Sequence, residues 1–160
     1  MAVVVLALGS NLGARLENLR AAVAMLGEGR VEITARSSAW ETAPLPADQP
    51  LFLNAVVCGE TDTRPLELLR LAKAIEHRLG RRPGRRWGPR PIDIDLLFYG
   101  EERLDTDELT IPHPRIAERG FILAPLAEVW PGRLPVLGAR AIDLLEGVGM
   151  EGMVRTGAAL

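Results

Sequence analysis

Apolar residues in the first third of the chain follow two patterns, continuous runs and repeats with helical spacing. Residues 2–8 (AVVVLAL) form a continuous, β-branched apolar run, which is typical of a strand buried on both faces. Residues 9–11 (GSN) have the composition of a turn. Apolar residues then recur three or four positions apart, at Leu16, Leu19, Val23 and Leu26. This spacing predicts a helix that ends at Gly27 and Gly29.

The middle of the chain continues with three further apolar segments and a second helix. Residues 31–42 begin with alternating apolar positions and predict one strand, and the Val- and Ala-rich residues 52–61 predict the next. Between them, residues 43–50 contain three prolines and predict a loop. Pro65 opens a second amphipathic helix, and residues 92–99 predict a fourth strand.

The predicted order is β-α-β-β-α-β, which is the pattern of a ferredoxin-like α+β fold. Such a fold has an antiparallel sheet with both helices on one face. Two short helical segments follow, near residues 121–129 and 141–146. The last residues, 150–160, lack periodicity, and we expect this tail to be loosely ordered. We see no linker, and we therefore expect residues 1–160 to form a single domain.

Composition narrows the classes of partner. The formal net charge is −2, which gives no general reason to expect a nucleic-acid or membrane partner. No apolar run approaches the ~20 residues of a membrane-spanning helix, and we expect a cytoplasmic protein. Cys58 is the only cysteine, so neither an intramolecular disulfide nor a cysteine-based metal site can form within the chain.

A pair of aspartates lies in the fourth predicted strand. Strand periodicity directs Asp93 and Asp95 to one face and Ile92, Ile94 and Leu96 to the other. The two Cα atoms would then be ~7 Å apart, since the rise is ~3.3 Å per residue. Oxygen ligands at this spacing suit Mg²⁺, which leaves room for phosphate oxygens and water. The alternative is a carboxylate pair on a solvated sheet face.

Arginines crowd the loop before these aspartates, at Arg81, Arg82, Arg85, Arg86 and Arg90. Guanidinium groups bind phosphate oxygens in a bidentate way, and the glycines and prolines of this loop let several arginines converge on one polyanion. Taken alone, a basic loop is more often solvated. Beside two carboxylates, however, it favours a site that handles phosphate through metal ions.

Three other residues suit a flat heteroaromatic ligand. Phe52 and Asn54 alternate on one strand face, and Phe121 begins a late helix. Two phenyl rings can stack on a ring system while the amide of Asn54 bonds its edge. Two core phenylalanines and a capping asparagine explain the same residues equally well. His113, between two prolines, could donate to phosphate, whereas Glu76 is expected on the helix surface.

Four stretches together resemble the 6-hydroxymethyl-7,8-dihydropterin pyrophosphokinase family of folate biosynthesis. They are ALGSNLG (7–13), DQPLFLNAVV (48–57), RRWGPRPIDIDLLFYG (85–100) and LTIPHPRIAERGFILAPLAEV (109–129). The resemblance implies a ferredoxin-like fold and a Mg²⁺-dependent enzyme that transfers pyrophosphate from ATP to the pterin hydroxymethyl group, releasing AMP. It runs to about residue 130.

The resemblance also implies roles for individual residues. It assigns two Mg²⁺ ions to Asp93 and Asp95, and catalytic roles to those aspartates together with Arg81 and Arg90. Pterin contacts are expected from Thr42, Leu45, Phe52, Asn54 and Phe121. ATP contacts are expected from Glu76, Arg82, Trp87, Arg90 and Leu96, and phosphate or nucleotide contacts from His113 and Arg119. ATP and the pterin would be the partners of a monomer that binds neither nucleic acid nor membrane.

Two competing hypotheses remain at this level. Ferredoxin-like folds also bind RNA, but the candidate strand carries two aspartates where an RNA-binding strand would carry aromatic residues. A different metal-dependent phosphotransferase would explain the arginines. It would not explain the combination of two phenylalanines with an asparagine.

Overall fold

Six strands form one antiparallel sheet in the computed structural model, which describes residues 1–44, 46–84 and 88–160. The strand order is β5-β1-β4-β3-β8, and β2 pairs with β4 beside β3. The strands are β1 (Ala2–Ser10), β2 (Glu32–Arg36), β3 (Ser38–Thr42), β4 (Phe52–Thr61), β5 (Asp93–Tyr99) and β8 (Met153–Ala159). A separate hairpin joins β6 (Leu104–Asp105) to β7 (Thr110–Ile111).

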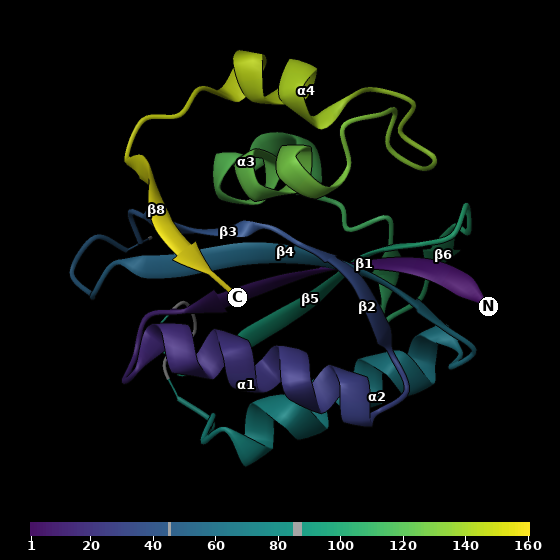
Figure 1. Ribbon diagram of the computed structural model, residues 1–160, viewed down its shortest axis with the longest axis horizontal. Coiled ribbons are helices and arrows are strands. Elements are labelled where there is room, and N and C mark those ends of the chain that lie inside the picture. Colours follow the sequence, from purple (N-terminus) through teal and green to yellow (C-terminus); the bar gives the residue numbers. More distant parts are fainter. Residues whose placement is uncertain (45, 85–87) are drawn as a thin grey trace.

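Helices cover both faces of the sheet (Figure 1). The helices α1 (Arg15–Glu28) and α2 (Pro65–Arg78) lie on one face, and α3 (Gly120–Val129) and α4 (Ala141–Val148) lie on the other. A short 3-10 helix (Ile116–Glu118) leads into α3. The βαββαβ core with both of its helices on one face confirms the ferredoxin-like α+β prediction.

Two hydrophobic cores result from this layering. The first, between the sheet and α1 and α2, contains Leu6, Leu8, Ile94 and Leu96. The second lies under α3 and contains residues of the opposite strand faces, such as Ala7 and Val56. Alternation along each strand therefore supplies both cores, which explains why β1 and β4 read as almost continuous apolar runs.

Among the predicted strands, those over residues 31–42 and 2–8 differ most from the observed elements. The strand predicted over 31–42 is interrupted at Ser37, whose Oγ accepts a hydrogen bond from the backbone N–H of Val56 at 2.9 Å. A side chain thus replaces a backbone acceptor there, and the strand divides into β2 and β3. At the other boundary, β1 continues through Gly9 and Ser10, which the composition assigned to a turn. Gly9 stays in the sheet because β4 and β5 pair with it on both sides, and Ser10 stays because it pairs with Leu53 of β4.

The expectation of a loosely ordered tail is wrong for residues 153–159. These residues form β8, which pairs antiparallel with β3 from Ser38 to Thr42. The Arg20 guanidinium also donates to the carbonyl of Ala159 at 2.8 Å. Without β8, the edge of β3 would have unpaired backbone N–H and C=O groups. Pairing with this edge gives the backbone groups of the tail their hydrogen-bond partners, even though the tail sequence has little hydrophobic pattern.

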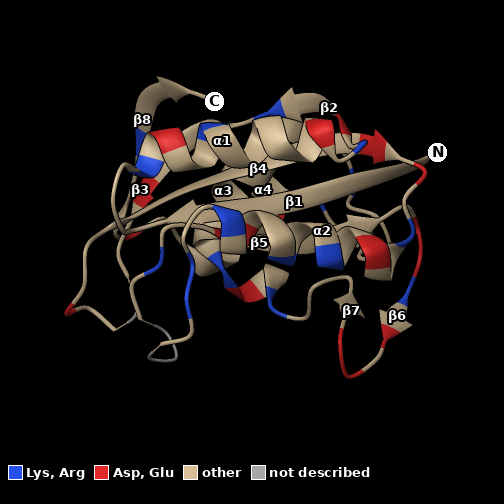
Figure 2. Cartoon of the chain, turned by 90° about the horizontal axis from the view of Figure 1, so that it is seen from below, with Lys and Arg blue, Asp and Glu red and all other residues tan. Residues whose placement is uncertain are grey.

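Charges of both signs are distributed over α1 and α2, and the turn between β6 and β7 is acidic (Figure 2). Neither helix presents the uniformly basic face that an RNA-binding surface would have. Among the described residues, none of the helices has both the length and the apolar character that crossing a membrane requires.

Candidate functional site

A cavity of about 550 Å³ opens on the α3 side of the sheet. Its walls come from the ends of β1, β3, β4 and β5, from the loop after β3, and from residues 115–122. Sites for small ligands commonly enclose about 300–1,000 Å³. Among the predicted site residues, it is lined by Thr42, Phe52, Asn54, Arg90, Asp93, Asp95, Arg119 and Phe121. The fold thus brings both predicted metal-binding aspartates, two of the predicted phosphate-binding arginines and four of the predicted ring-binding residues to one space.

The two aspartates reach the cavity because β5 alternates its side chains. Asp93 and Asp95 line the cavity, whereas Ile94 and Leu96 are buried in the first core, as the periodicity predicts. Both carboxylates face neighbours on the central strand, since Asp93 pairs with Gly9 and Asp95 pairs with Ala7.

Asp93 is neutralised by two arginines. The Nη1 atom of Arg81 lies 2.7 Å from its Oδ1, and that of Arg90 lies 3.6 Å from its Oδ2. The same Arg81 atom is 2.9 Å from an oxygen of Glu76. Arg81 therefore bridges the carboxylates of Glu76 and Asp93.

Asp95 has a different environment. Burial, and then the negative charge of Asp93, raise the pKa of Asp95 to about 7. The positive charge of Arg119 opposes this rise. A cation bound at the two carboxylates would offset both the cost of burying a charged Asp95 and its repulsion by Asp93. The pair is therefore electrostatically suited to a cation.

The pair Asp93 and Asp95 is a small ligand set. No cluster of three or more His, Cys, Asp or Glu ligands is found within the described ranges. Mg²⁺ suits such a site, because it binds through one or two carboxylates and completes its octahedron with water and substrate phosphates. The residues present therefore fit a metal ion that binds together with a polyanion.

The ring-binding residues form the other end of the cavity. The amide nitrogen of Asn54 donates to Oγ1 of Thr42 at 2.6 Å, which fixes the orientation of a nearly buried side chain. Phe121 is 36% exposed, and the guanidinium of Arg119 lies 5.5 Å from its ring centroid. Phe52, on the same strand face as Asn54, lines the cavity as well.

Glu76 is not a surface residue, which corrects the expectation from helical spacing. Its side chain is almost fully buried, and Oε2 accepts hydrogen bonds from the backbone N–H of Ile94 at 2.8 Å and from Arg81. Burial raises the pKa of Glu76. Because β5 is an edge strand, the N–H between the two aspartates has no partner strand, and Glu76 supplies its acceptor.

Several other predicted residues lie outside the cavity wall. Arg82 bonds the backbone carbonyls of His77 and Arg81, and the Leu96 side chain is in the first core. His113 is anchored by its N–H to the carbonyl of Leu97. Burial, followed by the charge of Arg119, lowers the pKa of His113. Leu45 and Trp87, like Arg85 and Arg86, lie outside the described residues.

Some cavity residues were not identified from the sequence. Ala7, Gly9, Arg115 and Glu118 line the wall. They lie within two of the stretches that carry the family resemblance, but nothing in those stretches singles out these four residues. The nearest signal is the decrease in side-chain size along one face of the first strand. Asn11 was missed as well: it is buried and accepts a hydrogen bond from the Arg90 N–H at 2.8 Å.

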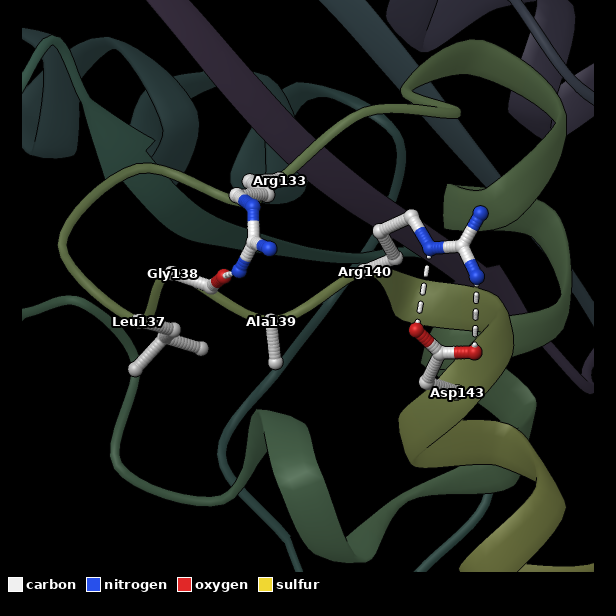
Figure 3. A pocket seen from close by; sticks show the side chains of 6 residues that line it. All are labelled: Arg133, Leu137, Gly138, Ala139, Arg140 and Asp143. Carbon is white, nitrogen blue, oxygen red and sulfur yellow. Dashed lines mark hydrogen bonds and ion pairs between the residues drawn. The ribbon is translucent and has the colours of Figure 1, made fainter.

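A second cavity lies beside the N-terminus of α4 (Figure 3). Its two guanidinium groups already have partners, because Arg133 donates to the Gly138 carbonyl at 2.8 Å and Arg140 is paired with Asp143 at 2.9 Å. It contains none of the residues identified from the sequence. The cavity on β5 is therefore the candidate site.

Comparison with known proteins gives the family to which the chain is similar. Residues 5–131 match the family model described as 7,8-dihydro-6-hydroxymethylpterin-pyrophosphokinase (HPPK). The 2-amino-4-hydroxy-6-hydroxymethyldihydropteridine pyrophosphokinase of Pseudomonas aeruginosa is 41% identical over 155 residues, covering 95% of this chain and 95% of that protein. The protein of that name from Bacillus subtilis is 48% identical over 126 residues, covering 78% of this chain and 75% of its own.

The chain also matches part of longer proteins in sequence, and it resembles solved structures in fold. The mitochondrial folate synthesis bifunctional protein of Arabidopsis thaliana is 50% identical over 127 residues, 79% of this chain and 23% of that protein. This chain thus spans about a quarter of the plant relatives it matches. A crystal structure of wild-type Plasmodium falciparum HPPK-DHPS superimposes with a TM-score of 0.71 at 17% identity, covering 97% of this chain and 47% of that one. This likeness supports the fold.

Proposed function

The chain belongs to the 7,8-dihydro-6-hydroxymethylpterin pyrophosphokinase family, and on that premise we propose that it transfers pyrophosphate from ATP to the hydroxymethyl oxygen of 6-hydroxymethyl-7,8-dihydropterin. The acceptor oxygen bonds to the β-phosphorus while the bond from that phosphorus to the α–β bridging oxygen breaks. The products are the pterin diphosphate and AMP, in a step of folate biosynthesis.

One observation carries the proposal. The carboxylates of Asp93 and Asp95 and the rings of Phe52 and Phe121 open into the same cavity. Neither half specifies the reaction alone, because carboxylates with arginines serve many phosphotransferases and aromatic pairs bind many flat ligands. Their juxtaposition supports a reaction between a nucleotide polyphosphate and a heteroaromatic acceptor.

At the phosphate end, we assign Asp93 and Asp95 as the ligands of two Mg²⁺ ions. When bound, these ions supply charge neutralisation of the triphosphate and acidification of the acceptor hydroxyl. Arg90 and Arg119, which line the cavity, contact phosphate oxygens, and Arg81 joins them after leaving Asp93. Catalysis is then mainly positioning and electrostatic stabilisation.

At the acceptor end, Phe52 and Phe121 stack on the two faces of the pterin. Asn54 bonds the edge of the ring, with its amide held by Thr42. Because the Asn54 side chain is fixed before the ligand arrives, little side-chain entropy is lost on binding. A pterin contact by Leu45 and nucleotide contacts by Glu76, Arg82, Trp87, Leu96 and His113 stay predictions.

The wider setting is proposed on the same premise. We expect ATP and the pterin as ligands, no nucleic-acid or membrane partner, and a monomer. The names of one relative from Arabidopsis thaliana and one from Pisum sativum include the word mitochondrial, whereas those of a second Arabidopsis relative and of the bacterial relatives do not. Cytoplasmic residence accordingly stays a prediction.

The deciding experiment is to incubate the protein with ATP, Mg²⁺ and 6-hydroxymethyl-7,8-dihydropterin and to identify the nucleotide product. AMP formation that requires both the pterin and Mg²⁺ supports the proposal. ADP would indicate an ordinary kinase, and the absence of nucleotide turnover would contradict enzymatic function. Asp95→Ala serves as the matched inactive variant, with an expected loss of several orders of magnitude in turnover.

A further inference from the structure

On the face of β1 that lines the cavity, the side chains become smaller toward the candidate site. Val5, Ala7 and Gly9 occupy successive positions on this face, while Leu6 and Leu8 on the opposite face stay large. Val5 packs in the second core, and Ala7 and Gly9 line the cavity. On this face, β1 therefore contributes a packed side chain at Val5 and leaves open space above Ala7 and Gly9.

Strand register places these small residues between the two halves of the site. Gly9 is opposite Asp93 on β5 and opposite Asn54 on β4. One row further along, Ala7 is opposite Asp95 and Val56. Residues directly opposite each other share a sheet face, so Gly9 and Ala7 form the floor between the carboxylates and the ring-binding side chains.

Backbone conformation does not require glycine at position 9. Six glycines of the described chain have a positive φ, and Gly9 is not among them. Gly9 also lies inside a strand, where glycine weakens the sheet because it has no side chain to pack. The reason for glycine must therefore be sought in the space above the strand.

That space is occupied by pterin-site residues. A Cβ at Gly9 would lie 2.6 Å from Oδ1 of Asn54 and 3.5 Å from Cδ1 of Phe52. Asn54 cannot easily withdraw, since its amide nitrogen is bonded to Thr42 at 2.6 Å and only 8% of the residue is exposed. A single methyl group would thus displace a hydrogen-bonding side chain that faces the ligand.

We propose that Gly9 is a positioning residue of the pterin site: its missing side chain sets the position of Asn54 and Phe52 and, with Ala7, provides the floor across which the hydroxymethyl arm of the pterin reaches Asp93 and Asp95. This inference rests on the proposed pterin pyrophosphokinase function. It predicts that substitution at Gly9 impairs the pterin half of the site and spares the metal half, because the nearest atoms to the added carbon belong to Asn54 and Phe52.

The test compares Gly9→Ala with Gly157→Ala, a strand glycine of β8 whose added Cβ meets no atom within 4 Å. Calorimetric titration measures the affinity for the pterin, for a non-hydrolysable ATP analogue with Mg²⁺, and for Mn²⁺ alone. Gly9→Ala should weaken pterin binding by about tenfold or more, as for other one-carbon changes in a pocket, and leave the other two affinities within about twofold. Gly157→Ala should match the wild type in all three.

A double-variant comparison separates the proposed contact from a general loss of structure. In an Asn54→Ala background the atom that meets the added carbon is absent, so Gly9→Ala should add less than about a twofold further loss of pterin affinity. If Gly9→Ala costs as much in that background as in the wild type, the contact with Asn54 does not set the affinity and the inference is wrong.

Ala7→Val provides an independent variant in case Gly9→Ala does not fold, because valine favours strands. It narrows the floor beside Asp95 and should also weaken pterin binding about tenfold. Wild-type pterin affinity in both variants would overturn the inference while leaving the proposed function intact. A wild-type protein that neither binds the pterin nor forms AMP would instead remove the proposed function itself.

Discussion

At the scale of single residues, Asp95 shows how the fold changes the chemistry of a side chain. Its carboxylate is placed in a partly buried position one row from Asp93, and burial followed by the charge of Asp93 raises its pKa to about 7. An unfolded aspartate has a pKa of about 3.9. The folded, metal-free protein therefore takes up a proton at Asp95 that the unfolded chain does not bind between these two values.

This proton uptake predicts a pH dependence of stability. Because the folded pKa is above the unfolded one, the contribution of Asp95 is most favourable at low pH and is lost as the pH rises toward about 7. Asp95→Asn should flatten the decline in the free energy of unfolding between about pH 4 and 7, measured by urea titration with a chelator present. Asp107→Asn, at an exposed turn, is the control, and an unchanged slope in Asp95→Asn would contradict the assignment.

At the scale of elements, the loop after α2 and the strand β5 are connected through Arg81. Its Nη1 atom contacts Asp93 and Glu76, and Glu76 also accepts the backbone N–H of Ile94. The arrangement joins the end of a helix, a basic loop and the strand that carries both aspartates. The guanidinium of Arg81 therefore contacts Oδ1 of Asp93, one of the two oxygens with which this carboxylate could bind a cation.

Competition between Arg81 and a cation leads to a prediction for metal binding. Arg81→Met should raise the affinity for Mn²⁺ alone by about three- to tenfold, because a positive charge in contact with Asp93 is removed. The same variant should weaken binding of the ATP analogue, since an arginine that contacts phosphate is lost. Titration followed by electron paramagnetic resonance measures the free Mn²⁺.

Arg82→Met is the matched control for this experiment. Arg82 carries the same charge on the next residue, but its guanidinium bonds only backbone carbonyls among the described partners. If both variants raise the Mn²⁺ affinity equally, the effect is one of net charge, and the direct competition at Asp93 is refuted.

At the scale of the whole molecule, the C-terminal strand β8 and the residue before it contact two elements that form walls of the cavity. Met153 pairs with Thr42, and the carbonyl of Gly152 accepts the N–H of Ala43, the residue that begins the cavity loop. Met153 also packs against Gly120 at the start of α3, where an added Cβ would lie 3.1 Å from its Cε. A segment with little hydrophobic pattern thus positions two walls of the site.

Removal of residues 150–160 is therefore expected to affect both stability and pterin binding. The exposed edge of β3 and the lost packing on α3 should lower the melting temperature by about 5 °C, which corresponds to about 2 kcal/mol for a domain of this size. Pterin affinity should decrease more than ATP affinity, because Thr42 orients Asn54. Val154→Thr, at a side chain that is 66% exposed, retains the strand and should behave as the wild type.

Local sequence information determined the elements of the βαββαβ core and the chemical composition of the site. Alternation along residues 93–96 was sufficient to direct both aspartates to one face, and Pro65 was sufficient to mark the start of α2. These predictions succeed because strand alternation and helix capping are properties of neighbouring residues. The presence of two carboxylates, several arginines and a phenylalanine pair was likewise visible before any fold was known.

Tertiary structure decided which of these residues meet and what surrounds them. Glu76 looks like a surface residue of a helix, and only the edge position of β5 shows that it accepts the N–H of Ile94. Gly9 belongs to a stretch with the composition of a turn. Only its pairing with β4 and β5 shows that it forms the floor between Asp93 and Asn54. Which distant strands pair depends on backbone hydrogen bonds and on packing across the sheet, and the residues of one segment do not determine these alone.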